Sequence, residues 1–125
     1  MKILVVDDEI DVKFLFEQRF RKEIKSGDME FAFAFSGEEA LAYMKEHDEK
    51  AVLILSDINM PGMTGLELLR RIKEAYKEPT PFVIMITAYG DTENYNTAMK
   101  YGADGFLTKP VDFVALKDKL IAKKV

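Results

Sequence analysis

The chain alternates short apolar runs with amphipathic segments, and this alternation restricts its fold more than any other feature. Each run is rich in β-branched and aromatic residues, and each following segment repeats its apolar residues every three to four positions, as one face of a helix does. Strict strand–helix alternation predicts an α/β fold with a parallel sheet. The predicted strands are Lys2–Val6, Met29–Phe35, Ala51–Ser56, Pro81–Thr87 and Asp104–Leu107. The predicted helices are Ile10–Lys25, one opened by Ser36, Thr64–Tyr76, Asp91–Tyr101 and Asp112–Lys123.

The strands differ in their apolar patterns, and the difference predicts their order in the sheet. Ile3–Val6, Val52–Leu55 and Phe82–Ile86 are apolar at successive residues, as strands buried on both faces are. Met29–Phe35 alternates large and small side chains, which favours an edge position. We therefore predict a doubly wound (βα)5 sandwich, whose five parallel strands have the order 2-1-3-4-5. This order leaves a crevice between strands 1 and 3, outside their carboxyl ends.

Length and composition restrict the class of protein. A chain of 125 residues fits one domain, 1–125, and 48% hydrophobic with 32% charged residues is typical of a globular protein. With no cysteine, disulfides and thiolate metal sites are excluded, and a cytoplasmic location is expected. The first apolar run is too short for a signal peptide, and no run predicts a membrane span. A net charge of −4 argues against direct nucleic-acid binding.

Polar residues stand where the predicted strands end. Asp7 and Asp8 follow the first strand, Asp57 follows the third, Thr87 ends the fourth, and Lys109 comes soon after the fifth. The carboxyl ends of parallel strands share one edge of a sheet. We therefore expect these five side chains to gather at the crevice.

Three carboxylates in one crevice need a positive partner. At about 4 Å, each pair of like charges repels by roughly 4 kcal/mol near a protein surface. Lys109 is one candidate partner and a divalent cation is another. Oxygen ligands without histidine or cysteine favour Mg²⁺, with Mn²⁺ as an alternative. The set indicates a metal-assisted phosphoryl site in which one carboxylate acts as nucleophile.

The segment after the third strand is expected to stay open beside Asp57. Pro61 disfavours helical angles at Met60, and Gly62 permits a turn. The helix therefore begins only at Thr64, and the backbone carbonyl of Asn59 is free to face a metal ion.

Four motifs now stand in order on four strand ends: "DD" after the first, "SDINMPGMTG" after the third, "MITAYG" after the fourth and "FLTKP" after the fifth. Together they resemble the receiver domain of two-component response regulators, the CheY-like family, over essentially the whole chain. The resemblance implies a flavodoxin-like or CheY-like fold. It also implies a phospho-accepting switch in a phosphorelay, and not an enzyme.

The resemblance implies a role for each residue at the crevice. Asp57 would accept a phosphoryl group from a histidine kinase or a histidine phosphotransfer protein. Asp8 would bind Mg²⁺ directly, with Asp7 assisting, and Asp57 and the Asn59 carbonyl would complete the protein ligands.

The resemblance also implies which residues respond to the phosphoryl group. Thr87 and Lys109 would bind it, and the small Ala88 would leave room for it. Phe106 occupies the switch-aromatic position, and Lys109–Pro110 resembles the cis peptide of the family.

The partner surfaces implied by the resemblance are two. The surface for a kinase or phosphotransfer protein would lie on the first helix around Val12 and Leu15. Phe14 of this helix lies outside its apolar face and is expected to be exposed. Tyr95, early on the fourth helix, belongs to the fourth helix–fifth strand–last helix face. That face would bind an as yet unidentified downstream protein or a second copy in a phosphorylation-dependent homodimer. No membrane partner is expected.

Two alternative functions use comparable elements: an enzyme that acts through the same aspartate, and a ligand binder on the same fold. A haloacid-dehalogenase-type phosphohydrolase needs a second acid two residues after the nucleophile, where this chain has Asn59. A flavin or nucleotide binder needs a Gly-rich or Ser/Thr-rich phosphate loop after the first strand, where this chain has Asp7-Asp8-Glu9. Both features argue against these alternatives.

Overall fold

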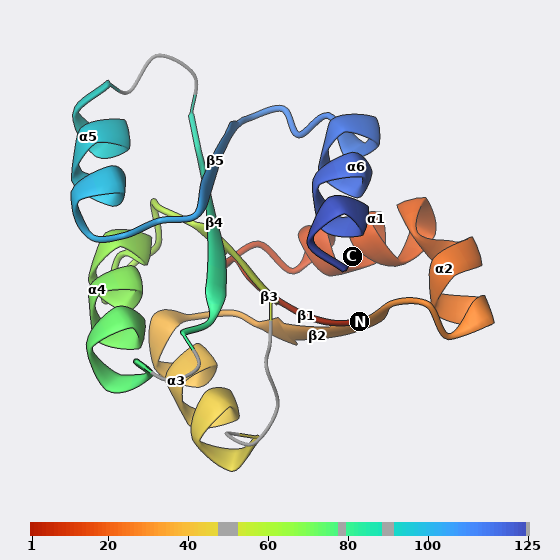
Figure 1. Ribbon diagram of the computed structural model, residues 1–125, viewed down its shortest axis with the longest axis horizontal. Coiled ribbons are helices and arrows are strands. Elements are labelled where there is room, and N and C mark those ends of the chain that lie inside the picture. The colour runs from red at the N-terminus through yellow and green to blue at the C-terminus, as the bar shows by residue number, and fades with distance from the viewer. Residues whose placement is uncertain (48–52, 78–79, 89–91, 125) are drawn as a thin grey trace.

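The computed structural model describes residues 1–47, 53–77, 80–88 and 92–124, and its centre is one parallel sheet (Figure 1). The strand order is β2-β1-β3-β4-β5, so the predicted 2-1-3-4-5 topology is confirmed. The predicted strand start at Ala51 and the predicted helix start at Asp91 lie outside the described residues. The strands are β1 (Lys2–Val6), β2 (Glu30–Ala34), β3 (Leu53–Asp57), β4 (Phe82–Thr87) and β5 (Gly105–Thr108).

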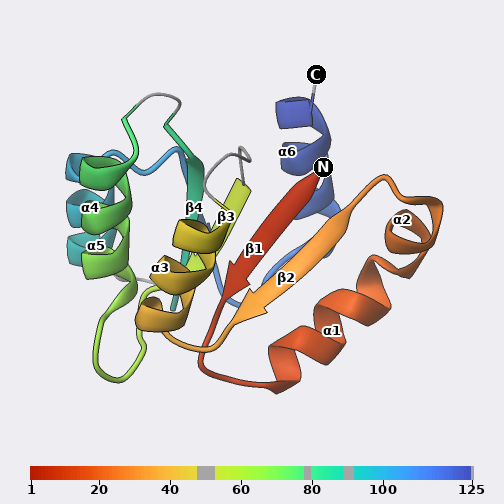
Figure 2. The same ribbon diagram turned by 90° about the horizontal axis from the view of Figure 1, so that it is seen from below.

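Helices cover both faces of the sheet (Figure 2). One face carries α3 (Gly37–Glu46), α4 (Gly65–Ala75) and α5 (Thr92–Lys100). The other carries α1 (Asp11–Arg19), α2 (Arg21–Ser26) and α6 (Phe113–Lys124). No helix among the described residues is both long and apolar enough to cross a bilayer.

Each central strand contributes to two apolar cores, because successive side chains point to opposite faces. Leu4 and Ile54 pack under α3–α5, whereas Val5 and Leu55 pack under α1 and α6. This explains why β1, β3 and β4 read as continuous apolar runs. The alternating strand β2 lies at the edge, as predicted.

The predicted single helix Ile10–Lys25 is wrong: the chain forms two helices that meet at Phe20. Phe20 leaves helical angles (φ −109°, ψ 23°), and its buried ring stacks on Phe16, with centroids 6.0 Å apart. After this break, Glu23 of α2 forms an ion pair with Lys117 of α6. The apolar spacing of four residues runs through the break, so periodicity alone did not reveal it.

Polar side chains that precede two of the helices cap them. The Ser36 hydroxyl accepts from the Glu39 N–H at 3.0 Å, and Asp112 caps α6 by accepting from the Val114 N–H at 3.0 Å. The Glu39 carboxylate accepts in return from the Phe35 N–H. In an ideal capping box it would accept from the N–H of the cap residue, Ser36. These caps fix where the helices begin after the strand ends.

Candidate functional site

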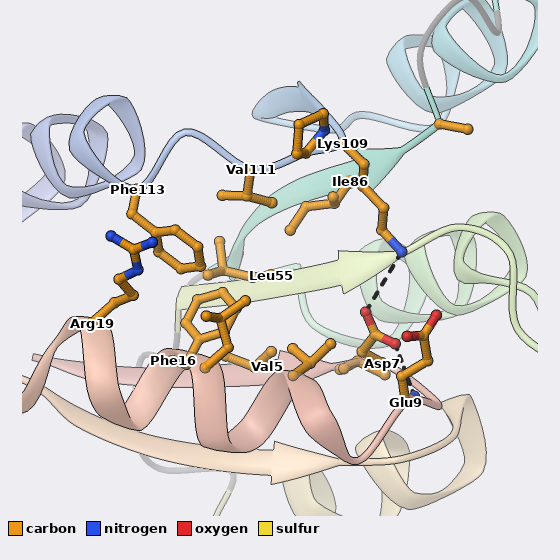
Figure 3. A pocket seen from close by; sticks show the side chains of 15 residues that line it. Val5, Asp7, Glu9, Phe16, Arg19, Leu55, Ile86, Lys109, Val111 and Phe113 are labelled. Atoms are coloured by element: carbon orange, nitrogen blue, oxygen red, sulfur yellow. Dashed lines mark hydrogen bonds and ion pairs between the residues drawn. The ribbon is translucent and has the colours of Figure 1, made fainter.

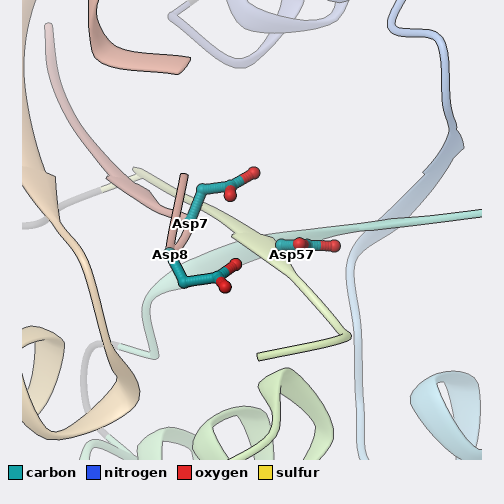
Figure 4. A group of neighbouring side chains, drawn as sticks. All are labelled: Asp7, Asp8 and Asp57. Atoms are coloured by element: carbon teal, nitrogen blue, oxygen red, sulfur yellow. The ribbon is translucent and has the colours of Figure 1, made fainter. Parts of the chain in front are cut away.

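Three carboxylates meet where β1 and β3 end (Figure 4). The two strands are paired, with Val6 beside Ser56, so the residues that follow them lie side by side. One carboxylate oxygen from each of Asp7, Asp8 and Asp57 lies within 4.8 Å of the others. Asp7 and Asp57 are buried and Asp8 is exposed. The gathering predicted from the strand ends is thus observed, and its exposed member gives solvent and ions access.

Lys109 reaches into this cluster from the segment after β5. Its Nζ lies 3.2 Å from Asp57 Oδ2 and 3.8 Å from Asp7 Oδ2, and Figure 3 shows it pointing toward Asp7. The Lys109 N–H also donates to the Thr87 carbonyl at 2.7 Å. The Lys109–Pro110 peptide is cis, as expected. Lys109 is therefore held at the backbone as well as by its charge.

The site changes the proton affinity of two of its groups. Burial raises the pKa of Asp7, and the nearby Asp57 charge raises it further. The Glu9 N–H, which donates to Asp7 Oδ1 at 2.9 Å, and the Lys109 charge act the other way without reversing the rise. Burial lowers the pKa of Lys109, but Asp57 and Asp7 together bring it above its ordinary value. Asp7 is thus a carboxylate whose ionisation the fold opposes.

The donor set fits a divalent cation. One ammonium group cannot balance three carboxylates, and the oxygens of these carboxylates are hard ligands. Such ligands suit Mg²⁺ or Mn²⁺, which keep several waters and use few carboxylates. Asp7, Asp8 and Asp57 are therefore the residues able to hold the ion.

Gly65 fixes the backbone of Asp57, a role that the sequence analysis missed. A Cβ at position 65 would lie 2.0 Å from the Asp57 carbonyl oxygen, so only glycine fits there. The Gly65 N–H donates to the Ile58 carbonyl at 2.8 Å, which joins the start of α4 to the end of β3. The only sequence signal was a glycine next to Thr64, the predicted start of the helix.

The loop between Asp57 and α4 is open, as predicted. Asn59 is exposed, whereas Met60 is buried and anchors the loop. Gly62 has a left-handed φ of 74°, and α4 begins after the cap residue Thr64. The role of the Asn59 carbonyl as a metal ligand stays a prediction.

Thr87 lies at the end of β4 with its side chain fully buried. Within the part of the chain that the structure describes, its hydroxyl oxygen has no hydrogen-bond partner. Burying a hydroxyl group without a hydrogen bond costs free energy. This hydroxyl is therefore a candidate to bind an acceptor atom of a ligand. The next residue, Ala88, is small and exposed.

The predicted switch and surface aromatics are in contact. Phe106 of β5 is half-buried beneath α5, and the Tyr95 ring meets it edge-on at a centroid distance of 5.0 Å. Tyr95 itself is 44% exposed. These two residues were predicted separately, and the structure joins them into one unit.

The predicted kinase-side residues lie on α1. Phe14 is exposed, as its position off the apolar stripe indicated, and Leu15 is partly exposed. Val12 is half-buried and packs against the core beneath α1. Phe14 and Leu15 thus offer exposed apolar surface on α1.

Comparison with known proteins places the chain in a family. Residues 3–121 match the family described as response regulator receiver domain. Sporulation initiation phosphotransferase F of Bacillus subtilis is 34% identical, over 94% of this chain and 88% of that protein. A chemotaxis protein CheY homolog of Campylobacter jejuni is 32% identical, over 96% and 89%. The transcriptional regulatory protein ResD of Bacillus subtilis is 38% identical over 87% of this chain, which covers only 42% of ResD.

Solved structures agree with these matches. The CheY-like response regulator receiver domain protein of Methanospirillum hungatei superposes with a TM-score of 0.81 at 31% identity. The match covers 98% of this chain and 91% of that one. The fold and the order of the site-bearing strands are therefore shared along the whole length.

Proposed function

This chain belongs to the response regulator receiver domain family, and we propose that Asp57 is its phosphate acceptor. The family acts in two-component phosphorelay signalling, and its members are signalling receivers and not classical enzymes. We assign residues 1–125 to one receiver domain in the cytoplasm. The observation that carries the proposal is the position of Asp57, which lies beside Asp7 and Asp8 with Lys109 Nζ 3.2 Å away.

The proposed reaction moves a phosphoryl group from a phosphohistidine to Asp57. A carboxylate oxygen of Asp57 attacks phosphorus and forms an O–P bond as the P–N bond breaks. The departing imidazole keeps the electron pair of that bond and takes up a proton from solvent. Phosphoryl transfer needs mainly positioning and charge balance, which fixed groups around the acceptor supply.

Members of the family use Mg²⁺ at an acidic pocket. We propose that Asp8, Asp7, Asp57 and the Asn59 carbonyl hold the ion in this chain. When bound, Mg²⁺ neutralises charge on the cluster and on the transferred oxygens. Lys109 is already paired with Asp57 and holds a further oxygen of the phosphoryl group.

The proposed switch begins at Thr87. Its buried hydroxyl, which lacks a partner among the described residues, gains one by donating to a phosphoryl oxygen on Asp57. This bond favours one arrangement of the end of β4, and a ligand shifts an equilibrium only by binding one state better. Phe106 and its neighbour Tyr95 then change position together, with Ala88 leaving room beside the phosphoryl group.

Receiver domains interact with histidine kinases or phosphotransfer proteins and with downstream effectors. We propose that the phosphohistidine protein docks beside α1, around Val12, Phe14 and Leu15. The α5–β5–α6 face, with Tyr95, is the proposed site for a downstream protein or for a second, phosphorylated copy. This chain covers only 42% of ResD, so the output of that regulator is not assigned to this chain.

Mass spectrometry of the intact protein tests the proposal directly. The chain is incubated with Mg²⁺ and acetyl phosphate, and the gain of one alkali-labile phosphoryl group is expected. The Asp57→Ala variant gains none, and the matched variant Asp104→Ala, outside the cluster, still gains one. An equal gain by Asp57→Ala, or no gain by the native chain, excludes Asp57 as the acceptor.

A further inference from the structure

A groove of about 650 Å³ lies between α1, the sheet and the segment Lys109–Phe113 (Figure 3). Its walls are mainly apolar. The sheet contributes Val5 and Leu55, α1 contributes Phe16, and the other wall holds Val111 and Phe113. Volumes of about 300–1,000 Å³ with apolar and aromatic walls are typical of small-molecule sites.

The two ends of the groove differ in charge. Arg19 stands at one end, where its guanidinium lies 5.4 Å from the centroid of the Phe113 ring. None of the ion pairs among the described residues includes Arg19, so its charge is available to a ligand. Asp7 and Glu9 stand at the other end, beside Lys109.

This distribution selects a ligand by charge and shape. An anionic head is attracted to Arg19, whereas the other end carries two carboxylates, Asp7 and Glu9, against the single ammonium group of Lys109 and stays negative. The head therefore has one favoured orientation. A cationic head at Arg19 would be repelled. The part of the ligand that lies between the two ends contacts Phe16, Val111 and Leu55. Its burial there is favourable only if it is apolar.

We propose that this groove binds a free amphipathic monocarboxylate of the class of medium-chain fatty acids. The carboxylate accepts hydrogen bonds from Arg19, and the hydrocarbon chain lies over Phe16 and Leu55 toward Val111. The inference goes beyond the proposed signalling function and does not depend on it. The site is complete without phosphorylation or a metal ion.

The test is an NMR titration of the full, ¹⁵N-labelled chain with decanoate, without Mg²⁺ or phosphodonor. Decylammonium, which has the same chain and an opposite head charge, is titrated in parallel. Saturable shifts of the Phe16, Val111 and Phe113 amides are expected with decanoate, and weaker or no shifts with decylammonium.

Two variants assign the head and the body of the ligand. Arg19→Gln is expected to weaken decanoate binding about tenfold, as the loss of one charge-assisted contact does. Arg21→Gln is the matched control, because Arg21 is exposed and does not line the groove, and it should bind like the native chain. Val111→Trp fills the groove and is expected to block binding, with its thermal unfolding recorded to show that it is folded.

The outcomes separate the proposal from its alternatives. Equal binding of decanoate and decylammonium, or equal effects of Arg19→Gln and Arg21→Gln, overturns the assigned head group. An absence of saturable shifts overturns the site altogether. Neither result bears on phosphorylation of Asp57, which the mass measurement tests separately.

Discussion

The rings of Tyr95 and Phe106 meet edge-on, with centroids 5.0 Å apart and planes 81° apart. Phe106 belongs to β5 and Tyr95 to α5, so the contact joins the strand next to Thr87 with an exposed helix surface. A movement of the half-buried Phe106 ring is therefore passed directly to the exposed Tyr95 ring.

A double-mutant cycle measures this contact. The free energy of unfolding is measured in urea for the native chain, Tyr95→Ala, Phe106→Ala and the double variant. A coupling energy of about 0.5–1.5 kcal/mol is expected for an aromatic pair. The coupling should change when Mg²⁺ and beryllium fluoride, a phosphoryl mimic, are added. Pairing Tyr95→Ala with Phe14→Ala, on the opposite face of the sheet, gives the additive control. If the effects of Tyr95→Ala and Phe106→Ala on the free energy of unfolding are additive under both conditions, this pair takes no part in the proposed switch.

Thr87→Val is expected to stabilise the unphosphorylated protein. The valine keeps the shape of the buried side chain and removes a hydroxyl that has no partner among the described residues, a gain of about 1 kcal/mol. The same change should abolish the extra stability conferred by Mg²⁺ and beryllium fluoride. Thr87→Ser keeps the hydroxyl and serves as control. A destabilised Thr87→Val in urea unfolding would show that the hydroxyl already has a partner.

Gly65→Ala should displace Asp57. The added Cβ would lie 2.0 Å from the Asp57 carbonyl oxygen, so the end of β3 or the start of α4 must shift, at a cost of about 2–4 kcal/mol. Phosphorylation by acetyl phosphate is expected to fall with it. Gly27→Ala is the control, because it adds a Cβ at a left-handed φ with nothing within 4 Å. It should cost about 1 kcal/mol and leave phosphorylation unchanged.

Asp7→Asn should raise stability at neutral pH without divalent ions. The pKa of Asp7 is raised above its ordinary value of 3.8, so the unfolded chain ionises this group at lower pH than the folded protein does. The stabilisation that protonated Asp7 gives the folded state is therefore lost as pH rises above 3.8. At pH 7 the ionised Asp7 lowers the free energy of unfolding. Urea unfolding with EDTA at pH 4 and 7 should show the gain of the variant mainly at pH 7. With Mg²⁺ the native chain should be more stable than Asp7→Asn, since the variant loses one ligand of the ion.

Lys109→Gln should make the protein more dependent on divalent ions. The change leaves Asp57 and Asp7 without the ammonium group that lies 3.2 and 3.8 Å away. Stability without metal is expected to fall at pH 7, and added Mg²⁺ should restore more of it than in the native chain. Lys25→Gln, at an exposed position on α2, is the control. Equal responses of the two variants to Mg²⁺ would contradict the charge balance described here.

The order of the sheet and the gathering of its acids were predictable from sequence. Continuous apolar runs place β1, β3 and β4 inside the sheet, and parallel strands bring Asp7, Asp8 and Asp57 to one edge. Both conclusions depend only on local pattern and on chain direction, which the sequence states directly.

Features that depend on packing between distant elements were not predictable. The break at Phe20 continues the apolar spacing of the helix, and only its contacts with Phe16 and the pairing of Glu23 with Lys117 show a change of direction. The close approach of Gly65 to Asp57 needs the crossing of a strand end and a helix start in three dimensions. The Arg19 groove likewise combines segments from opposite ends of the chain.

The acidic residues and their lysine meet at one edge of the sheet, although they are remote along the chain. Asp7 and Asp8 follow β1, whereas Lys109 follows β5, after every other strand has been made. During synthesis the carboxylates therefore leave the ribosome long before their counterion does. A nascent or truncated chain that lacks β5 therefore carries these carboxylates without their ammonium partner, and the charges are paired only once the last strand has joined the sheet.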